Sequence, residues 1–269
     1  MSVIENTLKE LSEVNKGLNL VEELQTEIHP EVFFRRNSVN LLIGKKGSGK
    51  TYNVFREIIK LRHVPNHNYT KLLYVSDKAY DPTYDRLKHL IPLTVEKVKY
   101  ENAADSIQQV SEAKVAIHDI IKNEINLDDI TEESKENIQN ILGTVELNPV
   151  QQSTYHTIVL LDDCQNVFDR KTRQNERLFK LLFENRQPKI TYFLTMQDPK
   201  HLDSSLKQNL DSCWFFGGFT EHKFKYLMND IPHEGDLIEV WETYRQLTKN
   251  QAIIFFITET GTTAAILSC

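Results

Sequence analysis

The sequence predicts an α/β fold in which a mainly parallel β-sheet carries helices on both faces. Short apolar runs, typical of buried strands, alternate along the chain with segments of helical periodicity. One such run, 38–43, leads into a glycine-rich turn, and two later runs end in polar residues, at Asp162 and at Gln197. Because ligands of parallel α/β sheets bind at the carboxyl ends of the strands, these three strand ends predict one common site.

The remaining elements follow from the same two patterns, period 2 or continuous apolar runs for strands and period 3.6 for helices. Strands are expected at 38–43, 71–76, 93–100, 157–161, 190–196 and 213–216, and helices at 51–62 and 175–184. The last two apolar runs, 252–257 and 263–267, predict a C-terminal β-hairpin that turns at 259–261.

Two segments are expected to lie outside this repeating pattern. Residues 1–37 predict an N-terminal helical extension, which leaves 38–269 for the main domain. Within that domain, about 101–145 predicts an acidic helical insertion, a solvated cover with Ile117, Ile120, Ile121 and Ile125 as its apolar stripe.

Charge is unevenly distributed along the chain. Residues 101–137 contain ten acidic residues against three lysines, which gives −7, whereas the whole chain has −6, so the remainder is about +1. The acidity is therefore local, and it neither supports nor excludes a nucleic-acid partner.

Composition restricts the class of protein. The chain is 40% apolar and 26% charged, as is usual for globular proteins. No apolar run approaches the roughly 20 residues that span a bilayer, and the N-terminus lacks the apolar core of a secretory signal. The three cysteines are widely spaced, which predicts neither a zinc site nor a disulfide framework. We expect an intracellular setting without a membrane partner.

The glycine-rich turn matches the pattern GxxxxGK[ST] at every fixed position, with a strand before it and a helix after it. Its glycines allow a tight turn with several N–H groups directed at an anion, and the helix that follows adds its positive end. Lys50 should reach the β- and γ-phosphates, and Thr51 should offer its hydroxyl to Mg²⁺. ATP is the expected ligand of the whole loop: Gly44, Lys45, Lys46, Gly47, Ser48, Gly49, Lys50 and Thr51.

A phosphate loop hydrolyses nothing without a carboxylate for the metal and a group that positions water. Asp162 is the predicted metal-side carboxylate. Asp163 is a candidate base or water-positioning residue, although an aspartate here can instead cap the following turn. Gln197 should emerge at the same sheet edge, where it can hydrogen-bond the γ-phosphate or the water. Together these residues predict an ATPase.

These elements, in this order, resemble the FtsK/HerA superfamily of P-loop ATPases, and most of all its viral branch, the poxvirus-type genome-packaging ATPases of large DNA viruses and virophages. The resemblance runs from about residue 38 to the C-terminus, with the acidic segment poorly matched. The stretch 183–191 places Arg186 where the family carries an arginine, although Gln187 replaces the histidine that usually follows. The basic-x-Asn-x-Asp pattern at 207–211 and the terminal hairpin also match.

The resemblance implies more than the motifs do. It implies an ASCE (RecA-like) P-loop NTPase sheet of order 5-1-4-3-2, with the glutamine strand between the loop strand and the carboxylate strand. It also implies a homo-oligomeric ring, a pentamer or hexamer, that translocates double-stranded DNA and packages a viral genome. The implied partners are DNA and capsid or portal vertex proteins, and the implied location is the virion and the host-cell cytoplasm (virus factory).

A ring that hydrolyses ATP between subunits needs a cation from the neighbouring subunit to stabilise the transition state. The candidates are Arg170, Arg173, Arg177 and Arg186. A surface arginine is usually only a solvated charge, so position in the family pattern favours Arg186.

Other functions remain open on the motifs alone. A P-loop ATPase for protein assembly or secretion, or for another nucleotide-dependent process, would carry the same loop. A small-molecule kinase usually has an arginine-rich lid, which the sequence does not contain. A nonhydrolysing scaffold is disfavoured by the Asp162–Asp163 pair and by Gln197.

Overall fold

The computed structural model describes residues 32–64, 69–121, 131–133, 156–168, 176–185, 188–197, 204–229, 236–258 and 261–267. Most of the predicted N-terminal extension therefore lies outside the described residues. The predicted apolar stripe of the acidic segment is also largely outside them: Ile125 is not described, and only the backbone is described for Ile117, Ile120 and Ile121.

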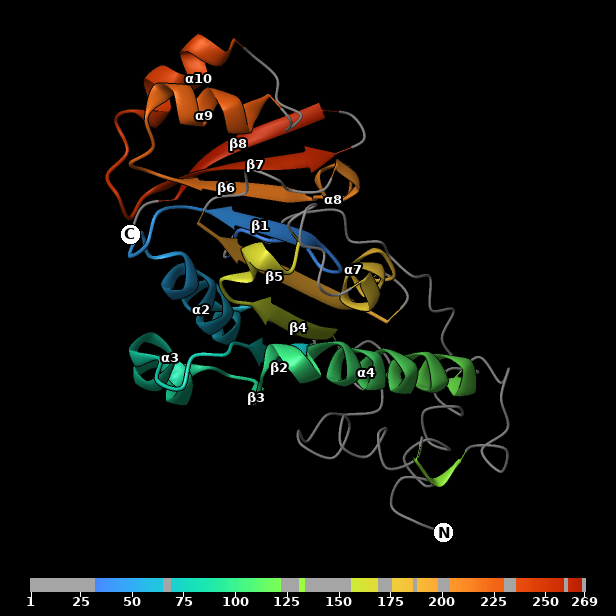
Figure 1. Cartoon of the computed structure of the whole chain (residues 1–269). Coiled ribbons are helices and arrows are strands. Elements are labelled where there is room, and N and C mark those ends of the chain that lie inside the picture. Colours follow the sequence, from blue (N-terminus) through green and yellow to red (C-terminus); the bar gives the residue numbers. More distant parts are fainter. Residues whose placement is uncertain are drawn as a thin grey trace.

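One eight-stranded sheet forms the centre of the molecule, in the order β3-β2-β4-β5-β1-β6-β7-β8 (Figure 1). The pairs among β1 to β6 are parallel, and β7 pairs antiparallel with both β6 and β8. The strands are β1 (Val39–Ile43), β2 (Tyr69–Val75), β3 (Thr94–Val98), β4 (His156–Leu161), β5 (Ile190–Met196), β6 (Ser212–Phe216), β7 (Ala252–Thr258) and β8 (Gly261–Leu267). The predicted α/β class with a mainly parallel sheet and a C-terminal hairpin is confirmed.

The five central strands carry the expected order. The glutamine strand β5 pairs with the loop strand β1 on one side and with the carboxylate strand β4 on the other. If these five strands are numbered 1 to 5 in chain order (β1, β2, β4, β5 and β6), their order in the sheet, β6-β1-β5-β4-β2, is 5-1-4-3-2. The complete sheet differs from that prediction in detail, because β3 extends one edge and the β7–β8 hairpin extends the other.

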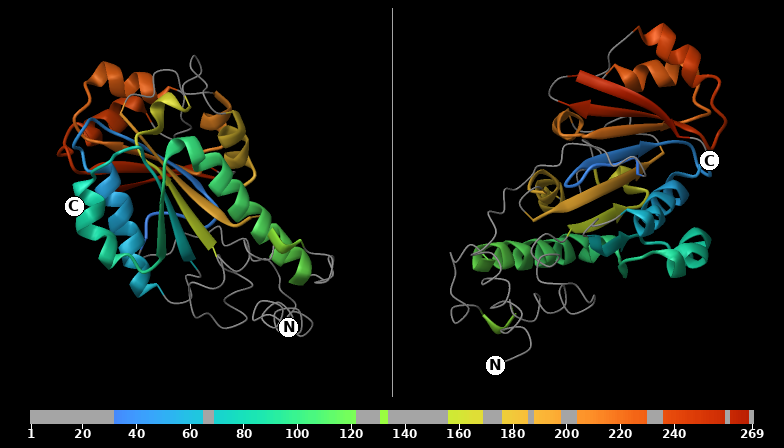
Figure 2. Two further views of the ribbon diagram at one scale, coloured as in Figure 1. Left: turned by 60° about the horizontal axis from the view of Figure 1, so that its bottom comes forward. Right: turned by 180° about the vertical axis from the view of Figure 1, so that it is seen from behind.

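Helices cover both faces of the sheet. Helices α2 (Lys50–Lys60) and α3 (Pro82–Leu87) lie on one face, whereas α4, α7, α8, α9 and α10 lie on the other (Figures 1 and 2). These are α4 (Tyr100–Ile121), α7 (Glu176–Phe183), α8 (Ser204–Gln208), α9 (Glu221–Met228) and α10 (Leu237–Tyr244). Three short 3-10 helices, η1 (Leu61–His63), η2 (Lys88–Leu90) and η4 (Cys164–Asn166), complete the described elements.

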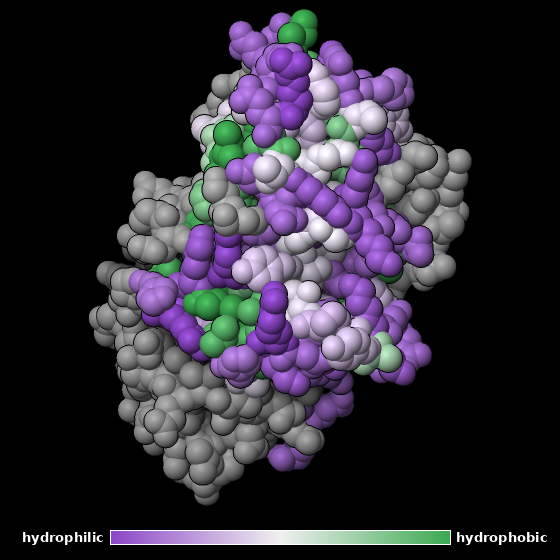
Figure 3. Space-filling view, turned by 90° about the vertical axis from the view of Figure 1, so that its left-hand side faces the viewer, coloured by the Kyte–Doolittle hydropathy of each residue, from purple (hydrophilic) through white to green (hydrophobic). Residues whose placement is uncertain are grey.

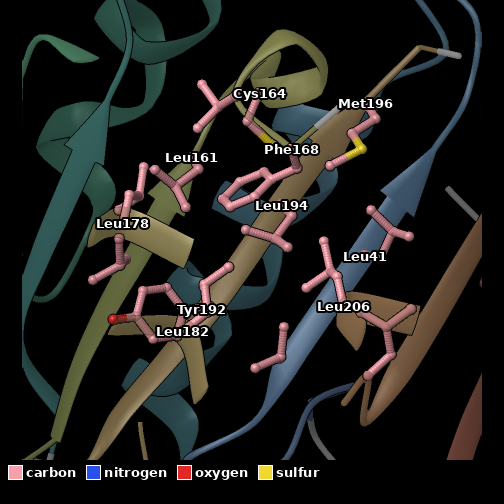
Figure 4. Packing of buried hydrophobic residues seen from close by; sticks show 14 of the residues in the cluster. Leu41, Leu161, Cys164, Phe168, Leu178, Leu182, Tyr192, Leu194, Met196 and Leu206 are labelled. Atoms are coloured by element: carbon pink, nitrogen blue, oxygen red, sulfur yellow. The ribbon is translucent and has the colours of Figure 1, made fainter. Parts of the chain in front are cut away.

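This double cover explains why the central strands are continuous apolar runs rather than alternating ones. Along β5, Tyr192, Leu194 and Met196 enter the core on one face, while Phe193 enters the core on the other. Figure 4 shows the first of these cores, where Leu161 and Leu194 pack beside Phe168. The strand ends are thus fixed on a buried, close-packed base.

Helix α4 corrects the expectation of a solvated acidic cover. Ala103, Ile107 and Val110 are buried in the same core as strands β2 and β4. Its acidic residues Glu101 and Asp105 point outward and are exposed. The first part of the acidic segment is therefore an amphipathic helix that closes one face of the sheet. Within the described ranges, no helix combines the length and apolar character that crossing a membrane would require.

Candidate nucleotide-binding site

The glycine-rich loop connects β1 directly to α2, and its glycines are structurally required. Gly47 and Gly49 have left-handed φ values of 72° and 86°, which L side chains rarely adopt. A Cβ atom at Gly44 would clash with the Ser48 hydroxyl and lie 2.8 Å from Phe216 Cβ. Gly49 is also the N-cap of α2 and supplies no side-chain cap, which leaves the first helical amides available to an anion.

Lys50, the first residue of α2, is folded back into this loop. Its ammonium donates to the carbonyl oxygens of Gly44 at 2.6 Å and Lys45 at 3.2 Å. Burial lowers the pKa of Lys50 to about 8, although the carboxylates of Asp163 and Asp162 oppose that shift. The buried ammonium is therefore held by neutral carbonyls at the place where the sequence predicts phosphates.

Asp162 follows the last residue of β4 and lies among several donors. Its Oδ1 accepts from the hydroxyls of Thr51 at 2.6 Å and Thr195 at 2.8 Å. Its Oδ2 accepts from the Lys78 ammonium and, at 3.4 Å, from the Tyr74 hydroxyl. Burial alone would raise the pKa of Asp162, but the hydrogen bonds from Lys78 and Thr51 outweigh it and hold the pKa below its usual range.

The chemistry of these donors fits a magnesium ion that is shared with a nucleotide. Thr51 and Asp162 offer oxygen atoms, which Mg²⁺ prefers. Among the described residues, no group of three or more His, Cys, Asp or Glu side chains could hold a metal by itself. An ion here would depend on phosphate oxygens and water for its other ligands, which is the usual arrangement for Mg²⁺ with nucleotides.

Asp163 and Gln197 face each other across the ends of β4 and β5. Gln197 Nε2 lies 3.1 Å from each carboxylate oxygen of Asp163. Asp163 has a left-handed φ of 60°, and its amide donates to Thr195 Oγ1 at 2.8 Å. It precedes η4 but makes no side-chain capping bond there. The alternative role as a turn cap is therefore not what the geometry favours, and the carboxylate points to the glutamine instead.

Three residues of this site were missed in the sequence. Thr195 lies within β5 and bonds to both Asp162 and Asp163, while Lys78 and Tyr74 come from the end of β2. The strand-end rule could have found Lys78, because β2 is parallel to β4 and pairs with it, so both strands end at the same edge. Figure 3 views the molecule from the side toward which the parallel strands point, and hydrophilic residues cover much of its described surface.

The predicted cation from a neighbouring subunit is not located by the structure. Arg186 lies outside the described residues, as do Arg170 and Arg173. Arg177 is described, and its guanidinium pairs with Asp105 and bonds to Gln108 on α4 of the same chain. Arg177 thus joins α7 to α4, and the role of Arg186 stays a prediction.

Comparison with known proteins adds fold-level evidence. No protein-family model and no curated protein matches the sequence, whereas many solved structures match the fold. The genome packaging NTPase B204 from Sulfolobus turreted icosahedral virus 2, in complex with ATP-gammaS, has a TM-score of 0.53 at 14% identity, over 85% of this chain and 96% of that one. B204 from Sulfolobus turreted icosahedral virus, described as a DNA-packaging ATPase, has a TM-score of 0.53 at 13% identity, over 85% of this chain and 96% of that chain.

A bacterial ATPase is equally similar. EssC (ATPases 2 and 3) from Geobacillus thermodenitrificans has a TM-score of 0.53 at 13% identity, over 86% of this chain and 39% of that chain. At such identities the likeness establishes the fold alone. That fold is the one that the sequence resemblance implied.

Proposed function

We propose that this chain, which has the fold of the FtsK/HerA-type P-loop ATPases, hydrolyses ATP at the edge formed by the ends of β1, β4 and β5. The observation that carries the proposal is the Asp163–Gln197 pair, placed beside the phosphate loop and the Thr51–Asp162 pair. A binding scaffold needs only the loop, whereas a hydrolase also needs a group that positions the attacking water.

Each residue has a defined task in this proposal. Lys50 exchanges the carbonyls of its own loop for the β- and γ-phosphate oxygens of ATP. Thr51 and Asp162 would hold Mg²⁺, which supplies positive charge to the phosphate oxygens. Asp163 orients the water and accepts its proton, and Gln197 keeps that carboxylate in place while its amide reaches the γ-phosphate.

Phosphate release by the purified full chain tests this function directly. We expect magnesium-dependent hydrolysis by the wild type and loss of hydrolysis, with ATP binding retained, in Gln197→Ala. Binding of a fluorescent ATP analogue provides the control. A wild type that binds ATP but releases no phosphate, with or without DNA, would contradict the proposal.

The finer part of the proposal is a motor that packages double-stranded DNA. It is supported by the sequence resemblance and by the likeness to B204, a viral genome packaging NTPase. Working as a homo-oligomeric ring, a pentamer or hexamer, the chain would act with capsid or portal vertex proteins. It would do so in the virion and the host-cell cytoplasm. Arg186 would supply the cation to the site of a neighbouring subunit.

A DNA titration separates packaging from the alternative. EssC is as similar in fold as B204, so an ATPase for protein assembly or secretion is the second candidate. A DNA motor should hydrolyse ATP faster when double-stranded DNA is added, and the stimulation should fall steeply as salt rises. An unchanged rate with DNA of any length would favour the second candidate.

A further inference from the structure

A turn far along the chain returns to the phosphate loop. It spans residues 247–251, in the connection between α10 and β7. A Cβ atom added at Gly47 would lie 3.3 Å from the Lys249 ammonium nitrogen, and one at Gly49 would lie 3.9 Å from Asn250 Oδ1. The turn therefore lies against the two left-handed glycines of the loop.

The turn is held in this position by the end of β6, the strand next to β1. Gly217 N donates to Gln251 O at 3.0 Å. Two further hydrogen bonds close the turn: Gln251 N donates to Thr248 O at 3.1 Å, and Thr248 N donates to Gln251 Oε1 at 2.8 Å. A Cβ atom at Gly217 would clash with the Thr248 carbonyl oxygen and lie 2.9 Å from Leu247 O. A glycine at 217 thus lets the turn pack directly on the β6 end.

The cation on this turn has no counter-charge among the residues that the structure describes. The Lys249 side chain is exposed, and among the described residues no hydrogen bond or ion pair engages its ammonium. It lies instead against the phosphate loop, 3.3 Å from the position of a Cβ atom at Gly47. A polyanion bound in the loop would therefore lie close to the Lys249 ammonium and be attracted to it.

We propose that the turn 247–251 forms a second wall of the nucleotide site, in which the Lys249 ammonium binds the polyphosphate of the nucleotide held by the loop 44–51. This proposal rests on the proposed nucleotide site but adds to it a residue outside every motif. It also gives the C-terminal hairpin, which begins at the end of the turn, a direct link to the nucleotide.

Nucleotide affinity of the full chain tests the role of Lys249. We expect Lys249→Gln to weaken binding of a fluorescent ATP analogue about tenfold, equivalent to about 1.4 kcal/mol. Lys249→Arg should keep most of the wild-type affinity. The affinity for AMP, which has one phosphate, should fall much less in Lys249→Gln than the affinity for the ATP analogue does. Because the side chain is exposed, the thermal midpoint should stay unchanged.

Lys225→Gln is the control, since Lys225 is a partly exposed lysine that pairs with Glu221 on α9. It should bind ATP like the wild type. If Lys249→Gln binds ATP as tightly as the wild type, the role of Lys249 is refuted while the proposed function stands. If the wild type binds no ATP, the proposed function fails and this proposal fails with it.

Discussion

The two ends of the parallel strands are both rich in polar side chains, yet they are built differently. At the amino end, Asn185 Nδ2 donates to Asn37 O at 2.6 Å and His156 Nδ1 lies 3.0 Å from Asn37 Oδ1. The Asn37 amide donates to Thr191 Oγ1 at 3.0 Å. These side chains pair with each other and with backbone groups, and they fix the left-handed Asn37 before β1. Such a network stabilises a fold and leaves little for a ligand.

At the carboxyl end the polar groups are mostly charged. Lys50 is buried against carbonyls of its own loop, and Asp162 pairs with the half-exposed Lys78. Asp163 faces Gln197. A buried charge is costly unless it is well paired, and phosphates with Mg²⁺ would pair these charges better than the protein does alone. The difference indicates which end is the site and which end is scaffold.

Removal of the central cation should have the largest effect. We expect Lys50→Ala to lower kcat/KM for ATP by about 10³-fold, because the phosphates lose a preorganised charge in a buried site. Stability should change little, since the variant also removes a buried ammonium whose pKa burial has lowered to about 8. Phosphate release and a thermal melt measure the two effects. Hydrolysis at the wild-type rate would refute the assignment of the carboxyl end as the site.

Asp163→Asn should have the next largest effect. The substitution keeps the size of the side chain but removes the proton acceptor, so we expect kcat to fall about 10²-fold. ATP affinity should stay within a few-fold, because Asp163 contacts Gln197 rather than the loop. Single-turnover hydrolysis and equilibrium binding separate the two quantities. A large loss of affinity with normal kcat would instead assign Asp163 to binding.

The amino end should give the opposite result. Asn185→Ala leaves the partly buried Asn37 carbonyl without its Asn185 donor, which should lower the free energy of unfolding by about 1–3 kcal/mol. The kcat for ATP should stay within about twofold. Urea unfolding and phosphate release, measured under conditions where the variant is folded, check both. A folded variant without ATPase activity would show that the two ends are coupled.

The sequence reveals the parts of this comparison that are local. The loop 44–51, Asp162 and Gln197 could be predicted because each is an uninterrupted pattern, a strand followed at once by its polar residues. Lys249 could not be predicted in this way, because it comes from a turn far along the chain, and Lys78 could be predicted only with the pairing of β2 and β4. The pairing of β2 with β4 brings Lys78 to Asp162.

Composition was misleading for α4. The acidic residues predict a solvated helix, but Ala103, Ala104, Ile107 and Val110 form a buried side between them. Segment charge alone therefore does not separate a cover from a core helix.

The ion pair between Lys78 and Asp162 should give the smallest effect of the series. Lys78 donates to Asp162 Oδ2, an oxygen that a divalent cation would also need, so the ammonium and the metal compete for it. Because the lysine side chain is 46% exposed, the pair contributes little free energy, about 0–1 kcal/mol. We therefore expect Lys78→Met to tighten Mn²⁺ binding in the presence of ADP by a few-fold, measured by electron paramagnetic resonance. Weaker Mn²⁺ binding in this variant would show that Lys78 helps to hold the nucleotide–metal complex, and the carboxyl end would then include Lys78 among its ligand-binding residues.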